Sequence, residues 1–220
     1  MKSLSNCRLY GIVDLNYIDV AKAVRVAERL IEGDVDLIQL RGKKKSIDEL
    51  VDLAAEVHEV TRRSSIPLIV NDHAEIAKKV PVEGVHVGQD DDPIAVVRDK
   101  VGRLVIVGKS THSLKQARAA QNEGADYIGF GPIFATPTKP DYKPIGLADI
   151  KQVHVDLALP IFCIGGIKID NLAQVMAAGA ERVVIVSGLL KAPDIADYAR
   201  ACKKLLIADL PGRRSFSKGG

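Results

Sequence analysis

Short apolar segments alternate with amphipathic segments along the whole chain. The apolar segments are rich in Val, Ile and Leu on successive residues, which is typical of strands buried on both faces. They predict eight strands, at residues 9–14, 37–40, 67–70, 85–87, 104–107, 127–130, 161–164 and 183–186. Between them, apolar residues recur at helical spacing, as in Val20, Val24 and Ala27. The pattern predicts helices at residues 19–32, 46–63, 74–79, 93–100, 113–123, 147–155, 170–178 and 193–207.

One helix start is marked by a capping box. Ser46 can accept a hydrogen bond from the third backbone N–H of the helix, and Glu49 can reach back to the N–H of Ser46. We therefore expect the second helix to begin here.

Eight strand–helix units in about 210 residues predict an α/β protein with a single (β/α)8 TIM barrel, at residues 1–210. The alternative is a doubly wound open sheet with a glycine-rich dinucleotide turn after the first strand. The residues at that point, Gly11-Ile12-Val13-Asp14, do not supply this turn. In a barrel, functional residues are expected just after the strands.

The charge of the chain is nearly balanced. Its 31 Lys and Arg exceed its 28 Asp and Glu by three, and residues 211–220 hold three basic side chains and no acidic one. We expect those ten residues to form a basic, disordered tail on a barrel of balanced charge. Aromatic residues make up 4% of the chain and Trp is absent, which argues against a nucleic-acid surface built from stacked aromatics.

The remaining composition indicates a cytoplasmic protein without a membrane partner. No apolar run has the roughly 18–20 residues of a membrane helix, and residues 1–8 lack the apolar core of a signal peptide. Cys7, Cys163 and Cys202 are far apart, so neither a disulfide framework nor a structural zinc site is indicated. A small-molecule enzyme or binding domain remains.

Acidic and basic side chains follow neighbouring predicted strands. Asp72 and one residue of the Asp90–Asp92 run can converge, and two carboxylates without nearby Cys or paired His favour a hard cation such as Mg²⁺. The alternative is that Asp72 caps a helix and the acidic run is a solvated loop. Arg41, Lys43 and Lys139 could enclose a diphosphate beside the metal. For Lys44 and Lys45 a solvated turn is the better interpretation.

The last two strands end in small residues. Gly165-Gly166 and Ser187-Gly188 suit a monophosphate bound by backbone N–H groups, as barrels often bind it after strands seven and eight. His73, His86 and His112 are interpreted as hydrogen-bonding residues of the pocket wall, and His58 and His154 as surface residues of helices.

At this point the sequence resembles the thiamine phosphate synthase family. The resemblance runs from about Arg8 to Leu206 and rests on an ordered set of segments rather than on one motif. The segments are residues 39–43 (Gln-Leu-Arg-Gly-Lys), 71–72 (Asn-Asp), 84–91 (Gly-Val-His-Val-Gly-Gln-Asp-Asp), 110–112 (Ser-Thr-His), 129–134 (Gly-Phe-Gly-Pro-Ile-Phe), 136–139 (Thr-Pro-Thr-Lys), 164–167 (Ile-Gly-Gly-Ile) and 186–187 (Val-Ser).

The resemblance implies a Mg²⁺-dependent transferase that joins 4-amino-2-methyl-5-hydroxymethylpyrimidine diphosphate to a thiazole phosphate or its carboxylated form. The products are thiamine monophosphate and diphosphate, with CO₂ from the carboxylated partner, through a dissociative carbocation mechanism. It implies catalytic roles for Lys139, Arg41 and Ser110 and Mg²⁺ ligation by Asp72 and Asp91. The implied pyrimidine-diphosphate contacts are Gln39, Leu40, Arg41, Gly42, Lys43, Asn71, Ser110 and Lys139, and the implied thiazole-phosphate contacts are Thr136, Pro137, Thr138, Gly166, Val186 and Ser187.

Three positions depart from the family pattern, namely His73, Lys109 and the Ser187-Gly188-Leu189 end of the eighth strand. They bear on kinetics and substrate tolerance rather than on the reaction. Two alternatives are a thiazole tautomerase-like isomerase on the same barrel and a non-catalytic phosphate-binding barrel. Thr136 to Lys139 and the acidic pair favour the synthase. The expected partners are small phosphorylated substrates, and association with further copies of the chain is left open.

Overall fold

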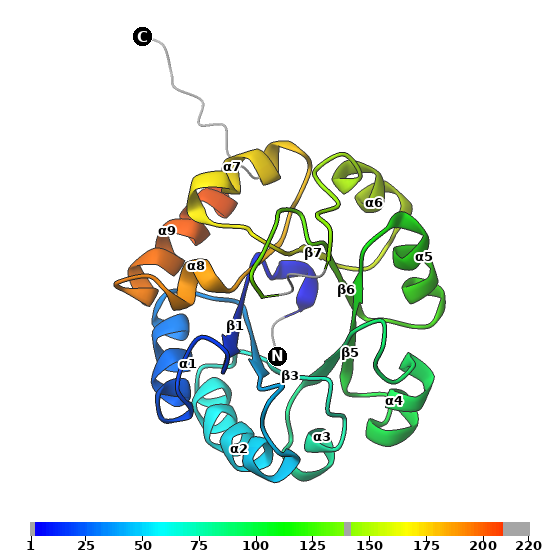
Figure 1. The fold of residues 1–220 in the computed structure, drawn as a ribbon. Coiled ribbons are helices and arrows are strands. Elements are labelled where there is room, and N and C mark those ends of the chain that lie inside the picture. Colours follow the sequence, from blue (N-terminus) through cyan, green and yellow to red (C-terminus); the bar gives the residue numbers. More distant parts are fainter. Residues whose placement is uncertain (1–2, 139–141, 209–220) are drawn as a thin grey trace.

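The computed structural model describes residues 3–138 and 142–208, and over these residues the chain forms a closed barrel of eight parallel strands (Figure 1). Each strand pairs with the next in sequence, and β1 closes the ring against β8 with Leu9 opposite Val183. The strands are β1 (Leu9–Asp14), β2 (Leu37–Arg41), β3 (Leu68–Asn71), β4 (Gly84–Val87), β5 (Ile106–Thr111), β6 (Tyr127–Phe130), β7 (Ile161–Cys163) and β8 (Val183–Ile185). The predicted TIM barrel is confirmed.

Helices surround the barrel, as the ring in Figure 1 shows. They are α1 (Ala23–Glu32), α2 (Ile47–Arg63), α3 (Ile76–Lys79), α4 (Ile94–Val101), α5 (Leu114–Asn122), α6 (Ile150–Asp156), α7 (Ile169–Ala177), α8 (Ser187–Leu190) and α9 (Ile195–Ala208), with 3₁₀ turns η1 (Leu4–Asn6) and η2 (Val20–Lys22). The expected capping box is present, because the Ser46 side chain accepts from the Glu49 N–H and Glu49 accepts from the Ser46 N–H. This exchange satisfies two N–H groups at the start of α2.

The strands divide the core into two layers because their side chains alternate in direction. On β3, Leu68 and Val70 face the helices and Ile69 faces the barrel interior. The inner layer also holds Tyr10, Tyr127 and other large side chains, and Leu4 of η1 packs against it. The outer layer is continuous beneath the helices. Polar residues at the carboxyl ends of the strands are thereby carried into the mouth of the barrel.

One sequence prediction about an element was wrong, and one element was missed. The fifth strand was expected at residues 104–107, but β5 runs from Ile106 to Thr111 and Leu104 is 96% exposed. Two positions of β5, Gly108 and Ser110, are not apolar, so the apolar pattern ends before the strand does. The prediction was therefore placed too early, over the preceding turn. Helix α8 was not predicted at all, because its four residues, starting at Ser187, are too few to show a helical period.

The prediction that His58 lies on the surface was also wrong. His58 is buried between α2 and the barrel, and its Nε2 lies 3.3 Å from Glu83 Oε1. The three cysteines are buried, and none of them forms a disulfide with another. Among the helices described here, none combines the length and apolar character needed to cross a membrane.

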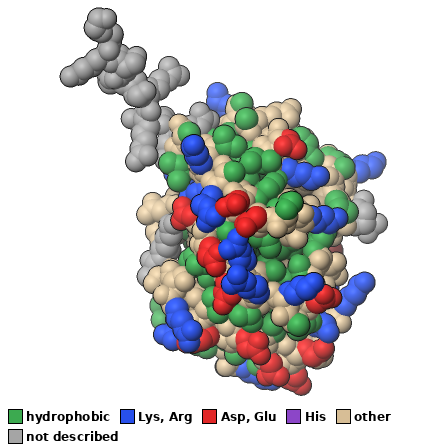
Figure 2. All heavy atoms as spheres, turned by 90° about the vertical axis from the view of Figure 1, so that its left-hand side faces the viewer, with side chains coloured by type: hydrophobic (Ala, Val, Ile, Leu, Met, Phe, Trp, Pro, Cys, Tyr) green, Lys and Arg blue, Asp and Glu red, His purple; other side chains and the backbone are tan. Residues whose placement is uncertain are grey.

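The face that carries α1, α8 and α9 shows Lys and Arg interspersed with Asp and Glu (Figure 2). Arg29 of α1 donates to both carboxylate oxygens of Asp194, at 2.7 and 2.6 Å, which ties α1 to the start of α9. The mixture of signs on this face agrees with the balanced charge of the barrel.

We predict that Gly108→Ala destabilises the protein. Gly108 lies opposite Tyr127 on the neighbouring strand, and a methyl group there would overlap the Tyr127 ring. Overpacking of this kind costs about 1–3 kcal/mol. Urea unfolding measures the loss. Gly129→Ala is the matched control on β6, because its added carbon would meet no atom closer than 3.6 Å; equal stability of the two variants would contradict the packing argument.

Candidate active site

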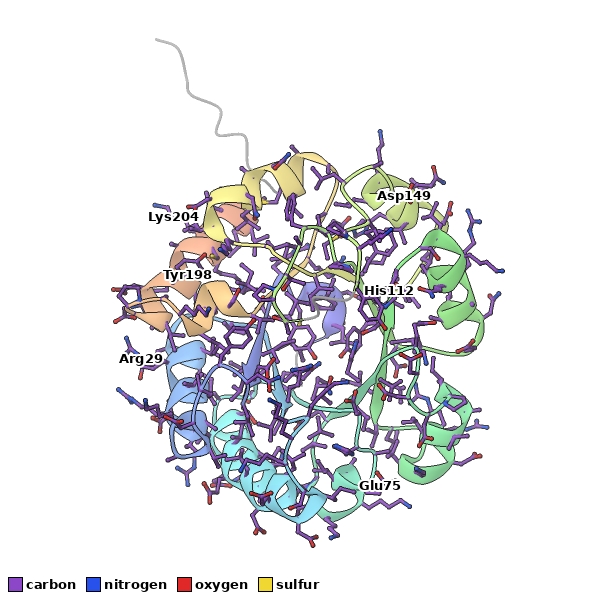
Figure 3. All side chains as sticks on the ribbon, in the orientation of Figure 1. Arg29, Glu75, His112, Asp149, Tyr198 and Lys204 are labelled. Atoms are coloured by element: carbon purple, nitrogen blue, oxygen red, sulfur yellow. The ribbon has the colours of Figure 1, made fainter. Side chains whose placement is uncertain are left out.

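A pocket opens at the carboxyl ends of the barrel strands. Nine of the predicted substrate contacts line it, namely Gln39, Arg41, Asn71, Ser110, Thr136, Thr138, Gly166, Val186 and Ser187. Leu40 has its side chain in the outer core, and Gly42 is enclosed by Leu15 and Leu50. Lys139 and residues 211–220 lie outside the described residues. His112 also lines the pocket and lies on the inner side of the helical ring, whereas the labelled Arg29, Glu75 and Lys204 lie on its outer part (Figure 3).

Arg41 is held by an acidic partner that the sequence analysis did not identify. Its Nη1 donates to Asp14 Oδ2 at 2.7 Å, and the Asp14 carboxylate is fully buried. The Asn16 N–H donates to the other oxygen of Asp14 at 3.0 Å. Asp14 lies opposite Arg41 in the β1–β2 register. The sequence does hold one sign of this partner, because Asp14 is a charged residue at the end of an otherwise uncharged strand. The pair fixes the guanidinium at the mouth of the pocket and offsets its charge.

Asp72 and Asp91 come together as predicted. Burial raises the pKa of the Asp72 carboxyl, the Asp91 carboxylate raises it further, and the Lys43 ammonium, 3.4 Å away, opposes both. The Gly88 N–H holds Asp91 Oδ2 at 2.6 Å. Asp72 has a φ of 65° and does not cap α3, whose N-cap is Glu75. Two carboxylates are thus kept close together in a partly buried place.

The rest of the acidic run lies elsewhere. Asp92 pairs with Lys100 at 2.7 Å, and Asp90 is exposed and accepts from the Tyr142 hydroxyl at 3.4 Å. Of the three aspartates, Asp91 is therefore the one placed against Asp72.

This pair fits a hard divalent cation. No group of three or more His, Cys, Asp or Glu side chains suited to a metal occurs within residues 3–138 and 142–208. Mg²⁺ does not require such a cage, because it retains waters and binds substrate phosphate beside one or two carboxylates. A cation between Asp72 and Asp91 would also remove the repulsion that raises the pKa of Asp72.

The opposite side of the pocket is built from close backbone contacts. Gly165 and Gly166 have φ values of 98° and 65°, and an added Cβ would collide with residues 132–135 of the loop after β6. That loop lies along the end of β7, where the Phe134 N–H donates to the Gly165 carbonyl at 3.0 Å. Glycine is required here by conformation and by space. Ser187 begins α8 at the neighbouring strand.

The loop after β6 is also tied to the loop after β1. Tyr17 Oη lies 2.7 Å from Thr138 Oγ1, and the Thr138 N–H donates to Thr136 Oγ1 at 3.3 Å. Lys191 Nζ lies 5.3 Å from the centre of the Tyr17 ring. The sequence analysis did not identify Tyr17, since a single tyrosine in a loop carries no pattern.

The floor of the pocket is aromatic and hydrogen-bonded. Tyr10, Tyr127 and Phe162 meet edge to face, with ring centres 5.4–6.1 Å apart. Burial raises the pKa of both tyrosine hydroxyls, so both phenols stay protonated. His86 contacts Tyr127 and Ser110. His112 donates from Nδ1 to the Gly131 carbonyl oxygen at 2.5 Å. His86 and His112 line the pocket, as expected, whereas His73 does not.

Comparison with known proteins gives one consistent result. The sequence matches the thiamine monophosphate synthase family over residues 9–189. It is 41% identical over 200 residues to a thiamine-phosphate synthase of Chloroflexus aurantiacus, covering 90% of this chain and 92% of that protein. It is 42% identical over 189 residues to one of Halalkalibacterium halodurans, covering 86% and 90%. The solved structure of a thiamine phosphate pyrophosphorylase from Pyrococcus furiosus superimposes on this one with a TM-score of 0.87 and is 28% identical in sequence. The match covers 96% of this chain and 100% of that one.

We predict that Asp72→Asn stabilises the metal-free protein at neutral pH. The pKa of Asp72 is higher in the folded state than the ordinary value of 3.8, so the folded state holds a proton that the unfolded state has already lost. The stability of the protein therefore falls as the pH rises from 3.8 through the raised pKa of the folded state. Removing the charge should recover about 1 kcal/mol, or about 2–4 °C in Tm. Thermal unfolding in a chelator measures this. Asp90→Asn is the control and should change nothing, because Asp90 is exposed; a lower Tm for Asp72→Asn would contradict the argument.

Asp14→Asn should have the opposite effect. It leaves the buried Arg41 guanidinium without its counter-charge, which costs about 3 kcal/mol. Urea unfolding at pH 7 measures the loss. A variant as stable as the parent protein would show that Arg41 does not depend on Asp14.

Proposed function

The chain belongs to the thiamine monophosphate synthase family, and from that premise we propose how its pocket performs thiamine-phosphate synthesis. The enzyme is a transferase. We take its substrates to be 4-amino-2-methyl-5-hydroxymethylpyrimidine diphosphate and a thiazole phosphate or its carboxylated form. The observation that carries the assignment is the position of the Asp72–Asp91 pair beside a pocket that holds Arg41 and Ser110.

The pyrimidine diphosphate occupies the side of the pocket formed by β2, β3 and β5. Gln39, Arg41, Asn71 and Ser110 line that side and offer hydrogen bonds to the ring and the diphosphate. Lys43 is half exposed beside Asp72 and adds a positive charge. Leu40 and Gly42 contribute through their backbone, since the Leu40 side chain is in the outer core. The role of Lys139 remains a prediction.

Asp72 and Asp91 hold Mg²⁺ in this proposal. When bound, the cation offsets the negative charge that develops on the departing diphosphate. The protein's own part is to keep two carboxylates together: Gly88 fixes Asp91, and the left-handed backbone of Asp72 turns its carboxylate toward that partner.

The thiazole phosphate binds on the other side, formed by the ends of β7 and β8 and the loop after β6. Thr136 and Thr138 supply hydroxyls, and Gly166, Val186 and Ser187 supply backbone and side-chain donors. Pro137 shapes the loop between the two threonines. The backbone at Gly166 comes close to Phe134 and Ala135, so this subsite is rigid.

The reaction is dissociative. The bond between the pyrimidine methylene and the diphosphate breaks first, the electron pair leaves with the diphosphate, and the thiazole nitrogen then attacks the cation. Such a mechanism depends on positioning and on stabilisation of charge. Arg41 and Ser110 interact with the leaving group, while Ile12, Phe162 and Ile164 line the pocket and limit access of water to the cation. An isomerase acting on a carboxythiazole phosphate would use neither the carboxylate pair nor a diphosphate subsite.

The chain is expected to act in the cytoplasm on these small phosphorylated substrates, without nucleic acid or membrane partners. The expected location and the expected partners rest on the composition of the chain and on the family's chemistry.

The direct test is an assay of purified protein with both phosphorylated substrates and Mg²⁺. We expect stoichiometric release of diphosphate and formation of thiamine monophosphate, because each subsite holds one substrate. Neither substrate alone should release diphosphate at a comparable rate. Absence of product from folded protein would refute the proposed function.

A Mg²⁺ titration of activity tests the carboxylate pair separately. Asp91→Asn should need about tenfold more Mg²⁺ for half-maximal activity, because a ligand is lost. Asp90→Asn is the matched control, and its requirement should stay within about twofold, since Asp90 is exposed and accepts from the Tyr142 hydroxyl. Greater sensitivity at Asp90 would show that the wrong aspartate was assigned.

A further inference from the structure

Five side chains form a continuous hydrogen-bonded chain across the floor of the pocket. Gln39 Nε2 donates to Tyr10 Oη at 2.7 Å, and Tyr10 Oη lies 3.0 Å from Tyr127 Oη. Tyr127 Oη lies 3.0 Å from His86 Nδ1, and His86 Nε2 lies 2.9 Å from Ser110 Oγ. Both ends, Gln39 and Ser110, are proposed substrate contacts. The three residues between them have no role in the proposed function.

This hydrogen-bonded series of side chains lies inside the barrel rather than exposed at its mouth. Gln39, Tyr10, His86 and Tyr127 are between 0% and 9% exposed. They come from β2, β1, β4 and β6, so the chain crosses the interior from one side of the barrel to the other. Gly108 leaves the space that the Tyr127 ring fills. Buried polar side chains arranged in this way are held in one geometry by their mutual hydrogen bonds.

The Gln39 amide nitrogen can only donate, so the Tyr10 oxygen accepts there. One order of donation follows the series from this fixed end, in which the Tyr10 proton goes to Tyr127 Oη, the other oxygen within reach. Tyr127 then gives its own proton to His86 Nδ1. An imidazole that accepts at Nδ1 carries its proton on Nε2, which donates to Ser110 Oγ. The hydroxyl proton of Ser110 is therefore directed away from His86, into the pocket.

We propose that Tyr10 and Tyr127 are positioning residues that fix the tautomer of His86 and thereby make Ser110 a hydrogen-bond donor to the diphosphate leaving group. This inference rests on the proposed function for the identity of the ligand. One end of this hydrogen-bonded series is the Gln39 carboxamide, whose oxygen can only accept, and the other end is Ser110; both residues line the pocket. An aminopyrimidine diphosphate has the complementary order, with an amino donor on the ring and anionic oxygens on the diphosphate.

The consequence for catalysis is a specific effect on the step that releases diphosphate. Charge builds on the leaving oxygen as its bond to carbon breaks, and a donor aimed there binds the transition state more tightly than the ground state. Removing the Tyr127 hydroxyl leaves His86 free to adopt either tautomer, and Ser110 then donates to the ligand in only part of the population. We expect kcat to fall about tenfold for Tyr127→Phe, with KM for the thiazole phosphate unchanged.

The loss in kcat should become smaller as the substituted residue lies further from Ser110 in the hydrogen-bonded series. Tyr10→Phe removes the hydroxyl one step further away but leaves Tyr127 able to donate to His86, so its loss in kcat should be smaller, about threefold. Thr61→Val is the matched control. It removes a buried hydroxyl that donates to the His58 carbonyl in α2, outside the pocket, and should leave kcat unchanged.

Two measurements test the proposal. Nitrogen NMR of the neutral protein, with the His86 signal assigned by its loss in His86→Asn, should show a proton on Nε2 and none on Nδ1. Tyr127→Phe should shift this signal toward a mixture of tautomers, while Thr61→Val should not. The second measurement is a double-mutant cycle: Tyr127→Phe should lower kcat about tenfold in the parent protein and less than about twofold in Ser110→Ala.

The contradicting results are distinct. A proton on Nδ1 of His86, or on both nitrogens, would reverse or abolish the proposed order whatever the activity of the protein. An equal loss from Tyr127→Phe with and without Ser110 would show that Tyr127 does not act through Ser110. Should Tyr127→Phe fail to fold, Tyr10→Phe replaces it in both measurements, with a smaller shift of the tautomer and a loss in kcat of about threefold that is absent in Ser110→Ala. Lack of synthase activity in the parent protein would refute the proposed function, but the NMR result would still decide the hydrogen-bond order.

Discussion

Closure of eight short parallel strands forces alternate side chains into a narrow interior, and the site depends on this constraint. Side chains that face the helices can be apolar throughout, as Leu68 and Val70 are. Those that face inward must fill the barrel and, toward the carboxyl ends, satisfy one another's hydrogen bonds. Gly108 and Tyr127 illustrate the first requirement, since one is small because the other is large. The hydrogen bonds of Tyr127 illustrate the second.

The same constraint places charge unevenly around the mouth. Arg41 is offset by the fully buried Asp14, so it acts as a fixed hydrogen-bond donor more than as a free positive charge. Asp72 and Asp91, by contrast, face each other with Lys43 as a partly exposed counter-charge. Under the proposed function, the arrangement is less favourable without a cation and a diphosphate than with them. Stability is given up at the place where function needs a ligand.

The fold and much of the site could be predicted from the sequence because each depends on local pattern. Val-, Ile- and Leu-rich segments mark strands, and the Ser46–Glu49 pair marks the start of α2. What could not be predicted depends on register between distant strands. Asp14 becomes the partner of Arg41 only when β1 and β2 pair, and Tyr10 meets Tyr127 only across the closed barrel. The surface position expected for His58 was wrong because helix spacing alone does not reveal contact with Glu83. Sequence separation is the cause in these three cases, whereas α8 and Tyr17 were missed because their local signal is weak.

The account holds that diphosphate binds between the carboxylate pair and the hydrogen-bonded floor of one pocket. A crystal structure of the protein grown with diphosphate and Mg²⁺ tests this most directly. We expect the metal on Asp72 and Asp91, with diphosphate oxygens within hydrogen-bond distance of Arg41 and the Ser110 hydroxyl. Diphosphate bound instead at Gly166 and Ser187, or a metal away from the two aspartates, would contradict the account.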